Sequence, residues 1–538
     1  MAVKELPVLT NYDISPVTGF LPTDEPLQLL SDPYFQPWED TFNSFNGLLL
    51  ASRLRQRVQE LPVLDASRLK TKAEQRRGYL ILCMLSHAYV WGKHEVAAES
   101  LPASLAVPWQ KVADMLEMQP VLTHAAVVLW NWRLLYKDGP RDLSNLDTLA
   151  TLSGSSDESW FYLVTTAIEA TGAPVLSKIL SAMQLVRDAD QTGLIQELEA
   201  IRGIIMDLVA VLRRMFERCD PYVFYWKVRP YLAGWENMTE AGLPNGVRYE
   251  GVDNGQYKRL AGGSAAQSSL IHVLDIAFGV EHHPTGFRPN KSHGAHTNAA
   301  HVNGHTSNSY NDAAPKAQGL APSTTEAAAT APAPALGSGS TNFIQKMRFY
   351  MPGPHRNFLT HLTDVANIRP YVLSQAAAFE KGSRPAEVEE LITVYDECVH
   401  QIKVFRDVHI QMVTLYIVMQ ANRGPSISHG GFVSPSHAHA PKKAEANGTA
   451  EKTAPVANGA DETSASLASA KKGSSILYPQ KVIFGAPYGL AKKQEEGVVR
   501  GTGGTDLIPF LRQSRDETND SKIVPTSSIG TRKSSFAA

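Results

Sequence analysis

One histidine lies on the apolar side of a long helical pattern, where an imidazole could bind a metal or accept a hydrogen bond. The pattern runs from residue 389 to 420 and repeats apolar residues at three- and four-residue spacing. At about 100° per residue, His400 points to the side of this helix opposite His409. The apolar stripe that contains the histidine consists of Leu391, Tyr395, Cys398, Ile402, Phe405, His409, Met412 and Tyr416.

Two interpretations of His409 follow from this position. A buried imidazole needs a partner, because its nitrogens lose their hydrogen bonds to water. The residue can be a core histidine bonded to a backbone carbonyl. It can also be the axial ligand of a haem iron, since a lone neutral imidazole in an apolar helical pocket suits that ligation. The stripe alone does not decide between them.

Other motifs that carry chemistry are missing from the sequence. It contains no HExxH, no paired carboxylate motif, no Gly-x-Ser-x-Gly and no phosphate-binding loop, so hydrolases and nucleotide-dependent enzymes are not indicated. The three cysteines, Cys83, Cys219 and Cys398, lie far apart and predict neither a disulfide framework nor a zinc site. Seven histidines fall in low-complexity segments, where solvated side chains are the better interpretation: His293, His296, His301, His305, His429, His437 and His439.

A second candidate functional residue is an arginine beside a predicted helix break. Asp220 and Pro221 are typical of a helix N-terminus, so a new helix should begin there and carry the segment VFYWKVR. Pro230 disfavours helical geometry at the preceding residue, Arg229. We therefore expect Arg229 to sit at a break, where its side chain can face a cavity.

The elements that position these residues are predicted to be helices almost throughout. Apolar residues recur with helical spacing over residues 74–92, 121–136 and 194–219. The sequence therefore predicts an all-α protein.

Two segments, residues 284–341 and 422–474, interrupt this pattern with few large apolar side chains. They cannot bury enough surface to offset their ordering entropy, so we expect disordered inserts, and a disordered polar tail over 516–538. The remaining chain is long enough for two domains. We expect a small N-terminal helical domain over 1–128 and a larger helical domain built from the ranges 129–283, 342–421 and 475–515.

The composition limits the class of partner. The net charge is −2 with 43% hydrophobic residues, which lacks the basic excess of a nucleic-acid binder and favours a small neutral or zwitterionic ligand. The N-terminus has no signal-peptide core, and no stretch approaches about 18 consecutive apolar residues. We expect a cytoplasmic protein that does not span a membrane.

Four sequence blocks resemble the indoleamine 2,3-dioxygenases and occur in the order of that family. Weaker similarity includes AYVWG, LAVPW and YLAGW, so the resemblance covers most of residues 60–515 apart from the inserts. The four blocks are AGGSAAQSSLIHVLD at 261–275, MRFYMPGPHRNFL at 347–359, DVHIQMVTLYI at 407–417 and GTGGTDL at 501–507.

This resemblance implies one haem b, held in the larger domain with His409 as the proximal ligand. It implies a dioxygenase that opens the pyrrole ring of L-tryptophan with O2 to give N-formylkynurenine, the first step of the kynurenine pathway towards NAD. An electron donor would reduce the haem iron. No side-chain general base is required, and the sequence offers no candidate for a distal histidine.

The resemblance also assigns roles to single residues on the substrate side. Arg229 is similar to the arginine that binds the substrate carboxylate, which suits a guanidinium with paired donors. Phe224 and Phe161 match aromatic residues that hold the indole over the haem, although either could be plain core. Thr502, in the GTGG loop, resembles the residue that closes over the substrate, and Thr165 occupies the position of a distal serine.

On the haem side, the resemblance implies contacts from the glycine-rich turn and from the histidine helix. Gly263, Ser264 and Ala265 match the turn at the haem edge, where glycine lets the backbone approach closely. Arg406 matches a basic residue near a propionate, though an ordinary surface arginine fits as well. Besides Thr165, the chain departs from the animal enzymes at Tyr225 and Ala266, which replace a phenylalanine and a glycine, and its long inserts are typical of fungal members.

Two rival functions remain open at the level of sequence. One is a haem protein of this lineage that binds O2 with little turnover, with Thr165 and Tyr225 as the responsible departures. The other is a helical scaffold with an empty pocket, whose inserts recruit partners.

Overall fold

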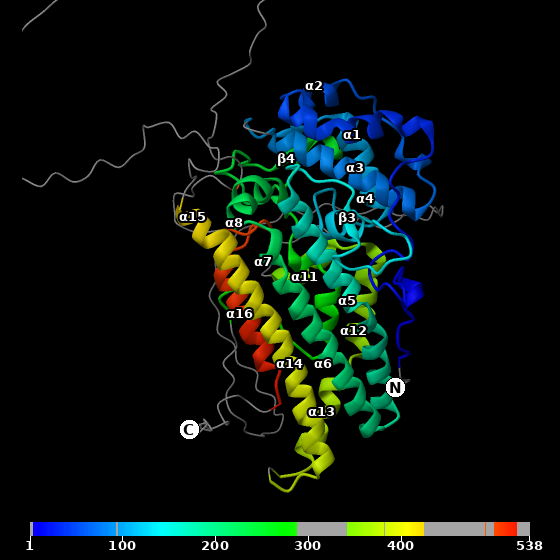
Figure 1. The fold of residues 1–538 in the computed structure, drawn as a ribbon, viewed down its shortest axis with the longest axis vertical. Coiled ribbons are helices and arrows are strands. Elements are labelled where there is room, and N and C mark those ends of the chain that lie inside the picture. Colours follow the sequence, from blue (N-terminus) through cyan, green and yellow to red (C-terminus); the bar gives the residue numbers. More distant parts are fainter. Residues whose placement is uncertain are drawn as a thin grey trace, which may run out of the picture.

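The computed structural model describes residues 4–92, 95–287, 342–380, 382–423, 490 and 500–523. This part of the chain is mostly helical with a few short strands, as Figure 1 shows, so the predicted all-α class is confirmed. The division into two domains at residue 128 stays a prediction.

Four helices gather at one end of the molecule, in blue at the top of Figure 1. The longest of them, α3, begins at a capping box in which Thr71 accepts a bond from the backbone N–H of Glu74, whose carboxylate in turn accepts from the N–H of Thr71. The helices are α1 (Gln36–Leu50), α2 (Leu54–Gln59), α3 (Lys72–Trp91) and α4 (Ala103–Met115).

Three long helices form the body of the molecule. Helix α6 (Gln191–Arg213) packs against both α5 (Ser156–Arg187) and α14 (Ala386–Val413). By length and composition α5 could cross a membrane, but 61% of its most apolar window is buried inside the fold. Core helices of helical proteins pass the same test, so this feature alone carries no further conclusion.

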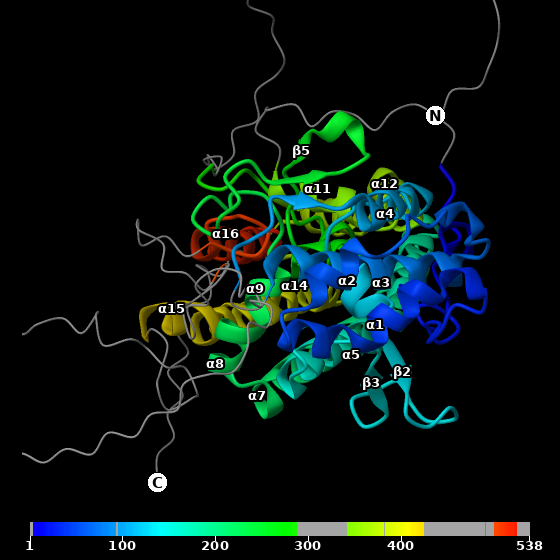
Figure 2. The same cartoon turned by 90° about the horizontal axis from the view of Figure 1, so that it is seen from above.

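Shorter helices cover and close this body. Helix α16 (Leu507–Asp520) lies along α14, and Figure 2 shows the two side by side in red and yellow. The others are α7 (Met215–Arg218), α8 (Pro221–Val223), α9 (Arg229–Leu232), α10 (Ser269–Ala277), α11 (Phe343–Met347), α12 (Gly353–Val365), α13 (Ile368–Ala377) and α15 (Met419–Arg423).

Strands are few and short. Strand β4 (Val247–Tyr249) pairs in parallel with β1 (Ser100–Leu101) and antiparallel with β5 (Tyr257–Lys258). A separate hairpin joins β2 (Trp132–Leu134) to β3 (Leu146–Thr148).

The helix expected over 121–136 is wrong. Only a single π-helical turn, η4 (Ala125–Leu129), forms there, and the chain then extends into strand β2. Every residue of that turn is buried. A segment that is apolar on all sides carries no period, so its pattern does not distinguish helix from buried extended chain.

The predicted inserts fall almost wholly outside the described residues, and so does most of the predicted tail. The tail boundary at 516 is wrong, however, because α16 continues to Asp520. The residues beyond the predicted boundary are held by side-chain bonds, since Glu517 pairs with His282 and Thr518 accepts a bond from Arg406. Residues 284–287, expected in the first insert, are also described, and Gln513 donates to the carbonyl oxygen of Pro284.

Candidate functional site

A cavity of about 270 Å³ lies among α5, α6, α10, α14 and α16. Its walls are mainly apolar side chains such as Ile205, Leu208 and Phe405. Each residue that the sequence assigned to the site lines this cavity: Phe161, Thr165, Phe224, Arg229, Gly263, Ser264, Ala265, Arg406, His409 and Thr502. The cavity therefore brings together residues from widely separated parts of the chain.

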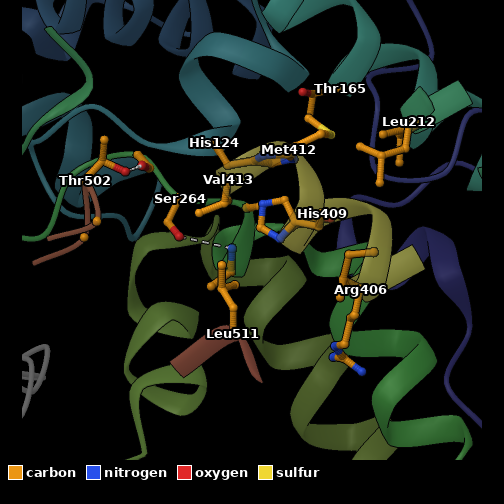
Figure 3. A pocket seen from close by; sticks show the side chains of 18 of the residues that line it. His124, Thr165, Leu212, Ser264, Arg406, His409, Met412, Val413, Thr502 and Leu511 are labelled. Atoms are coloured by element: carbon orange, nitrogen blue, oxygen red, sulfur yellow. Dashed lines mark hydrogen bonds between the residues drawn. The ribbon is translucent and has the colours of Figure 1, made fainter. Parts of the chain in front are cut away.

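His409 stands on α14 with its imidazole in the cavity. In Figure 3 the ring extends from the yellow helix towards the side that Ser264 occupies. Burial, with a smaller effect of the nearby Arg406 charge, lowers the pKa of His409 to about 4, so the ring is neutral at pH 7. His400 is exposed on the other side of the helix, as its position in the pattern predicts.

The surroundings of His409 differ from those of His87, a core histidine that is hydrogen-bonded through both ring nitrogens. His87 donates from Nδ1 to the carbonyl oxygen of Tyr231 at 2.8 Å, and the N–H of Leu122 donates to its Nε2 at 2.8 Å. His409 has no such partner among the residues that the structure describes. His355 is also buried with both ring nitrogens unpaired, but it does not line the cavity. The place of an unpaired imidazole in the wall of an apolar cavity therefore favours the ligand interpretation of His409.

The glycine-rich turn and the GTGG loop meet on another side of the cavity. The N–H of Gly262 donates to the carbonyl oxygen of Thr502 at 3.2 Å, and the Thr502 hydroxyl donates to the carbonyl oxygen of Gly263 at 2.5 Å, the dashed line at Thr502 in Figure 3. A Cβ on Gly262 would lie 2.3 Å from backbone atoms of Gly234 and Leu232. Glycine is required there because two backbone segments touch.

Ser264 ends this turn as the N-cap of a short 3-10 helix, Ala265–Gln267. Its hydroxyl accepts a bond from the N–H of Ala266 at 3.2 Å. The sequence-predicted contacts of Gly263, Ser264 and Ala265 with a haem edge stay predictions, supported by their place in the cavity wall.

Arg229 is buried with 1% of its surface exposed and lines the cavity. Its guanidinium donates to the carbonyl oxygen of Leu490 at 2.9 Å and to that of Arg500, while Nε has no partner. No acidic side chain among the described residues pairs with it. Burial lowers the pKa of Arg229 to about 10, so the group remains a cation at pH 7.

The backbone at Arg229 differs from the expectation. Helix α8 begins after the Asp220 cap as predicted, but Arg229 itself is helical, with φ −53° and ψ −38°. A π-helical turn, η5 (Phe224–Val228), directly precedes it. A π-turn has one more residue per hydrogen-bonded turn than an α-helix. This extra residue leaves space for the ring of Pro230, so the helix continues through Arg229 without a break.

Aromatic side chains line the cavity near this arginine. The rings of Phe161 and Phe224 lie 4.8 Å apart, and Phe224 contacts Tyr416 edge-on at 5.7 Å. The Thr165 hydroxyl donates to the carbonyl oxygen of Phe161 at 2.9 Å, within its own helix. The guanidinium carbon of Arg229 lies instead over the ring of Tyr225, 5.1 Å from the centre of that ring.

Arg406 has strong partners of its own. It donates to both carboxylate oxygens of Asp275, at 2.8 and 2.7 Å, and to the hydroxyl of Thr518. Figure 3 shows its guanidinium directed away from the imidazole of His409. Arg406 is not an ordinary surface arginine, because only 11% of its side chain is exposed. Its proximity to a propionate stays a prediction.

Several polar residues of the cavity are not predicted from the sequence, among them His124 and Glu169. His124 lines the same cavity as Thr165, and the expectation that the chain has no distal histidine stays a prediction. Nε2 of His124 donates to Glu169 at 2.8 Å. The available signal was the spacing on α5, where Phe161, Thr165 and Glu169 follow one another at four-residue intervals and so share one face.

The residues of the cavity fit a haem better than a metal ion held by protein alone. No group of three or more metal-binding side chains occurs among the described residues. A haem iron needs one axial ligand from the protein, and the unpaired imidazole of His409 is the candidate for it in this cavity. The apolar walls suit the faces of the haem macrocycle. The glycine-rich turn has no bulky side chain at Gly262 and Gly263, so its backbone can approach the edge of the macrocycle closely.

Comparisons with known proteins agree with this fit. Residues 8–521 match the family model described as indoleamine 2,3-dioxygenase. The chain is 34% identical to indoleamine 2,3-dioxygenase of Saccharomyces cerevisiae, covering 96% of this chain and 94% of the relative. It is 30% identical to indoleamine 2,3-dioxygenase 2 of Homo sapiens, with 96% of each chain covered. A 6-hydroxytryptophan 2,3-dioxygenase of Fusarium equiseti is 30% identical over 77% of this chain and 86% of the relative.

Proposed function

The chain belongs to the indoleamine 2,3-dioxygenase family, and from that premise we propose how the side chains of its cavity carry out the family reaction. The protein is a haem-dependent oxidoreductase that cleaves the indole C2=C3 bond of L-tryptophan with O2 and forms N-formylkynurenine, in the kynurenine route of tryptophan catabolism. Both oxygen atoms enter the product. When bound, the haem supplies the iron at which O2 is activated.

His409 would hold this haem from the proximal side. Its low pKa keeps the ring neutral at pH 7, so ligation displaces no proton. Ser264, Ala265 and Gly263 would border the haem, and Arg406 would hold the turn of α14 that carries the ligand through its pair with Asp275.

Arg229 would bind the carboxylate of tryptophan. The uncompensated guanidinium and the unpaired imidazole of His409, in one apolar cavity, are together the observation that carries the proposal. A carboxylate would give the buried cation the opposite charge that it lacks, and the rings of Phe161 and Phe224 would hold the indole flat. These contacts orient the substrate for reaction.

Thr502 would close the site. Its bonds to the glycine-rich turn join the GTGG loop to the cavity wall, and the preceding Arg500 carbonyl is bonded to Arg229. The position of the GTGG loop is thereby linked to Arg229, the carboxylate-binding residue, so closure of the loop excludes water when the substrate is held.

Thr165 adds a methyl group where a serine would have none, and its hydroxyl is already bonded to the helix backbone.

We also propose a cytoplasmic enzyme that receives electrons from an external donor and binds neither nucleic acid nor a membrane. The net charge of −2 and the burial of α5 support this part of the proposal.

Two measurements on the purified protein test the function. A Soret band should show bound haem, and mass spectrometry should find N-formylkynurenine from L-tryptophan when ascorbate and methylene blue keep the haem reduced. A Soret band without product would indicate the O2-binding protein with little turnover. Protein that takes up no haem would indicate the scaffold and would refute the proposal.

A further inference from the structure

The His124 and Glu169 pair brings two ionisable side chains into a cavity wall that is mainly apolar. The neighbouring lining residues are Leu122, Val127 and Ile168. His124 and Glu169 are 5% and 2% exposed. Burying a polar pair in apolar surroundings costs free energy unless the hydrogen bonds of both side chains are made. A polar pair at this place in the wall is therefore a candidate for a functional role.

Glu169 fixes which nitrogen of His124 carries the proton. One carboxylate oxygen of Glu169, Oε1, accepts bonds from His124 Nε2 at 2.8 Å and from the Ser268 hydroxyl at 2.7 Å. Because a carboxylate only accepts, Nε2 is the protonated nitrogen when the imidazole is neutral. Nδ1 of His124 is then an acceptor.

The acceptor nitrogen is available to a ligand in the cavity. Nδ1 of His124 has no hydrogen-bond partner among the described residues, and this atom is not completely buried. Oε2 of Glu169 also has no partner, but it is completely buried. An acceptor cannot donate to bound O2, so the pair does not act as the distal histidine of an oxygen carrier.

The position of the pair suits the far end of a bound tryptophan. Phe161 and Glu169 lie on one face of α5, eight residues or about 12 Å apart. Phe161 contacts Phe224, close along the chain to Arg229. With the carboxylate at Arg229 and the indole beside Phe161, the benzene edge of the indole points along this face towards His124.

We propose that His124 is a specificity-determining residue that accepts a hydrogen bond from a donor on the benzene ring of the substrate, and that Glu169 is its positioning residue. The inference rests on the proposed function and names a substrate class for the same site, namely ring-hydroxylated tryptophans. A site that pairs a hydroxyl discriminates against an analogue without one, because its buried acceptor is then left unpaired.

The test compares substrates of nearly equal size. Values of kcat/KM are measured for the 5-hydroxy and 5-methyl and for the 6-hydroxy and 6-methyl derivatives of L-tryptophan. Binding of each to the ferric haem protein is measured by optical titration, which is independent of turnover. At one of the two ring positions the wild type should prefer hydroxyl over methyl by about tenfold or more in both measurements.

Variants assign that preference to residues. His124→Phe and His124→Leu should bring the ratio close to one. Glu169→Leu should also bring the ratio close to one, because it releases the imidazole of His124. Glu169→Gln should keep most of the preference for hydroxyl, since an amide oxygen can still accept a hydrogen bond from Nε2. The matched control is His400→Phe, an exposed histidine on α14, which should leave the ratio unchanged.

The outcomes separate this inference from the proposed function. If L-tryptophan gives no N-formylkynurenine with the wild type, the proposed function fails. If product forms but the wild type shows no preference for hydroxyl at either position, or if the preference survives in both His124 variants, the inference alone is overturned. A loss of preference in Glu169→Gln as complete as in Glu169→Leu would overturn the positioning role.

Discussion

Arg229 is the residue at which burial and charge conflict most directly. Its guanidinium is withdrawn from water, bonded only to neutral carbonyl oxygens, and has one nitrogen without a partner. Lysine would not replace it well, because an ammonium lacks the planar pair of donors that matches a carboxylate. The residue therefore has the properties of a binding site prepared for an anion.

Removing this guanidinium should weaken the enzyme selectively. Loss of one partner of a desolvated charge pair costs roughly 2 to 5 kcal/mol, or about 30-fold to several thousandfold in kcat/KM. Arg229→Ala should show that loss for L-tryptophan in steady-state kinetics while its Soret band is unchanged. The exposed arginine Arg213 provides the control variant Arg213→Ala, which should behave as the wild type. Unaltered kinetics of the Arg229 variant would remove the carboxylate role.

At the scale of elements, a buried ionic network holds the histidine helix in place. Arg406 on α14 pairs with Asp275 on α10, and His282 bridges Asp275 at 2.9 Å and Glu517 on α16 at 2.8 Å. Opposite charges nearby outweigh burial, so the pKa of Asp275 is lowered and that of His282 is raised. The network therefore fixes the turn before His409 against two other helices.

Asp275→Asn should expose how much the network contributes. The amide leaves Arg406 and His282 buried with less compensating charge, which typically costs about 3 to 5 kcal/mol. We expect a lower urea midpoint and faster loss of haem on dilution. The control is Asp188→Asn, at the end of α5, which should change neither property. An unchanged midpoint in the Asp275 variant would show that the network is not a source of stability.

The same elements show what sequence can and cannot predict. The stripe around His409 is readable because polar residues occupy the other faces of α14. Residues 125–129 are apolar throughout, so their pattern predicts a helix that does not form. Arg229 was expected to face a cavity, which it does, but its conformation depends on a π-turn with no local signature. The pairs Arg406 with Asp275 and His124 with Glu169 join residues far apart in the chain, so only the folded structure reveals them.

At the scale of the whole molecule, buried neutral histidines make stability depend on pH. Burial lowers the pKa of His87 to about 3 and that of His272 to about 4. Between those values and the unfolded pKa of about 6.5, the unfolded chain binds more protons than the folded one. Stability therefore rises with pH across this window and is lost as the pH falls. The raised pKa of His282 acts in the opposite sense.

We expect the free energy of unfolding to fall by about 2 kcal/mol for each of these two histidines between pH 8 and pH 5. Urea unfolding at several pH values measures it. His272→Gln should reduce the pH dependence more than His400→Gln, because the imidazole of His400 is exposed even though its pKa is also lowered. A midpoint that is the same at pH 5 and pH 8 would mean that the two imidazoles are not held neutral by burial.

The central claim is that a single imidazole, that of His409, attaches the haem on which the whole activity depends. It is tested most directly by the haem content of His409→Ala, measured as the ratio of Soret to protein absorbance after purification, beside His400→Ala as the matched control on the same helix. We predict that the His409 variant retains little haem and forms no N-formylkynurenine, that exogenous imidazole partly restores its spectrum, and that the His400 variant keeps both haem and activity. A His409→Ala protein with normal haem content and an unchanged Soret band would contradict the assignment.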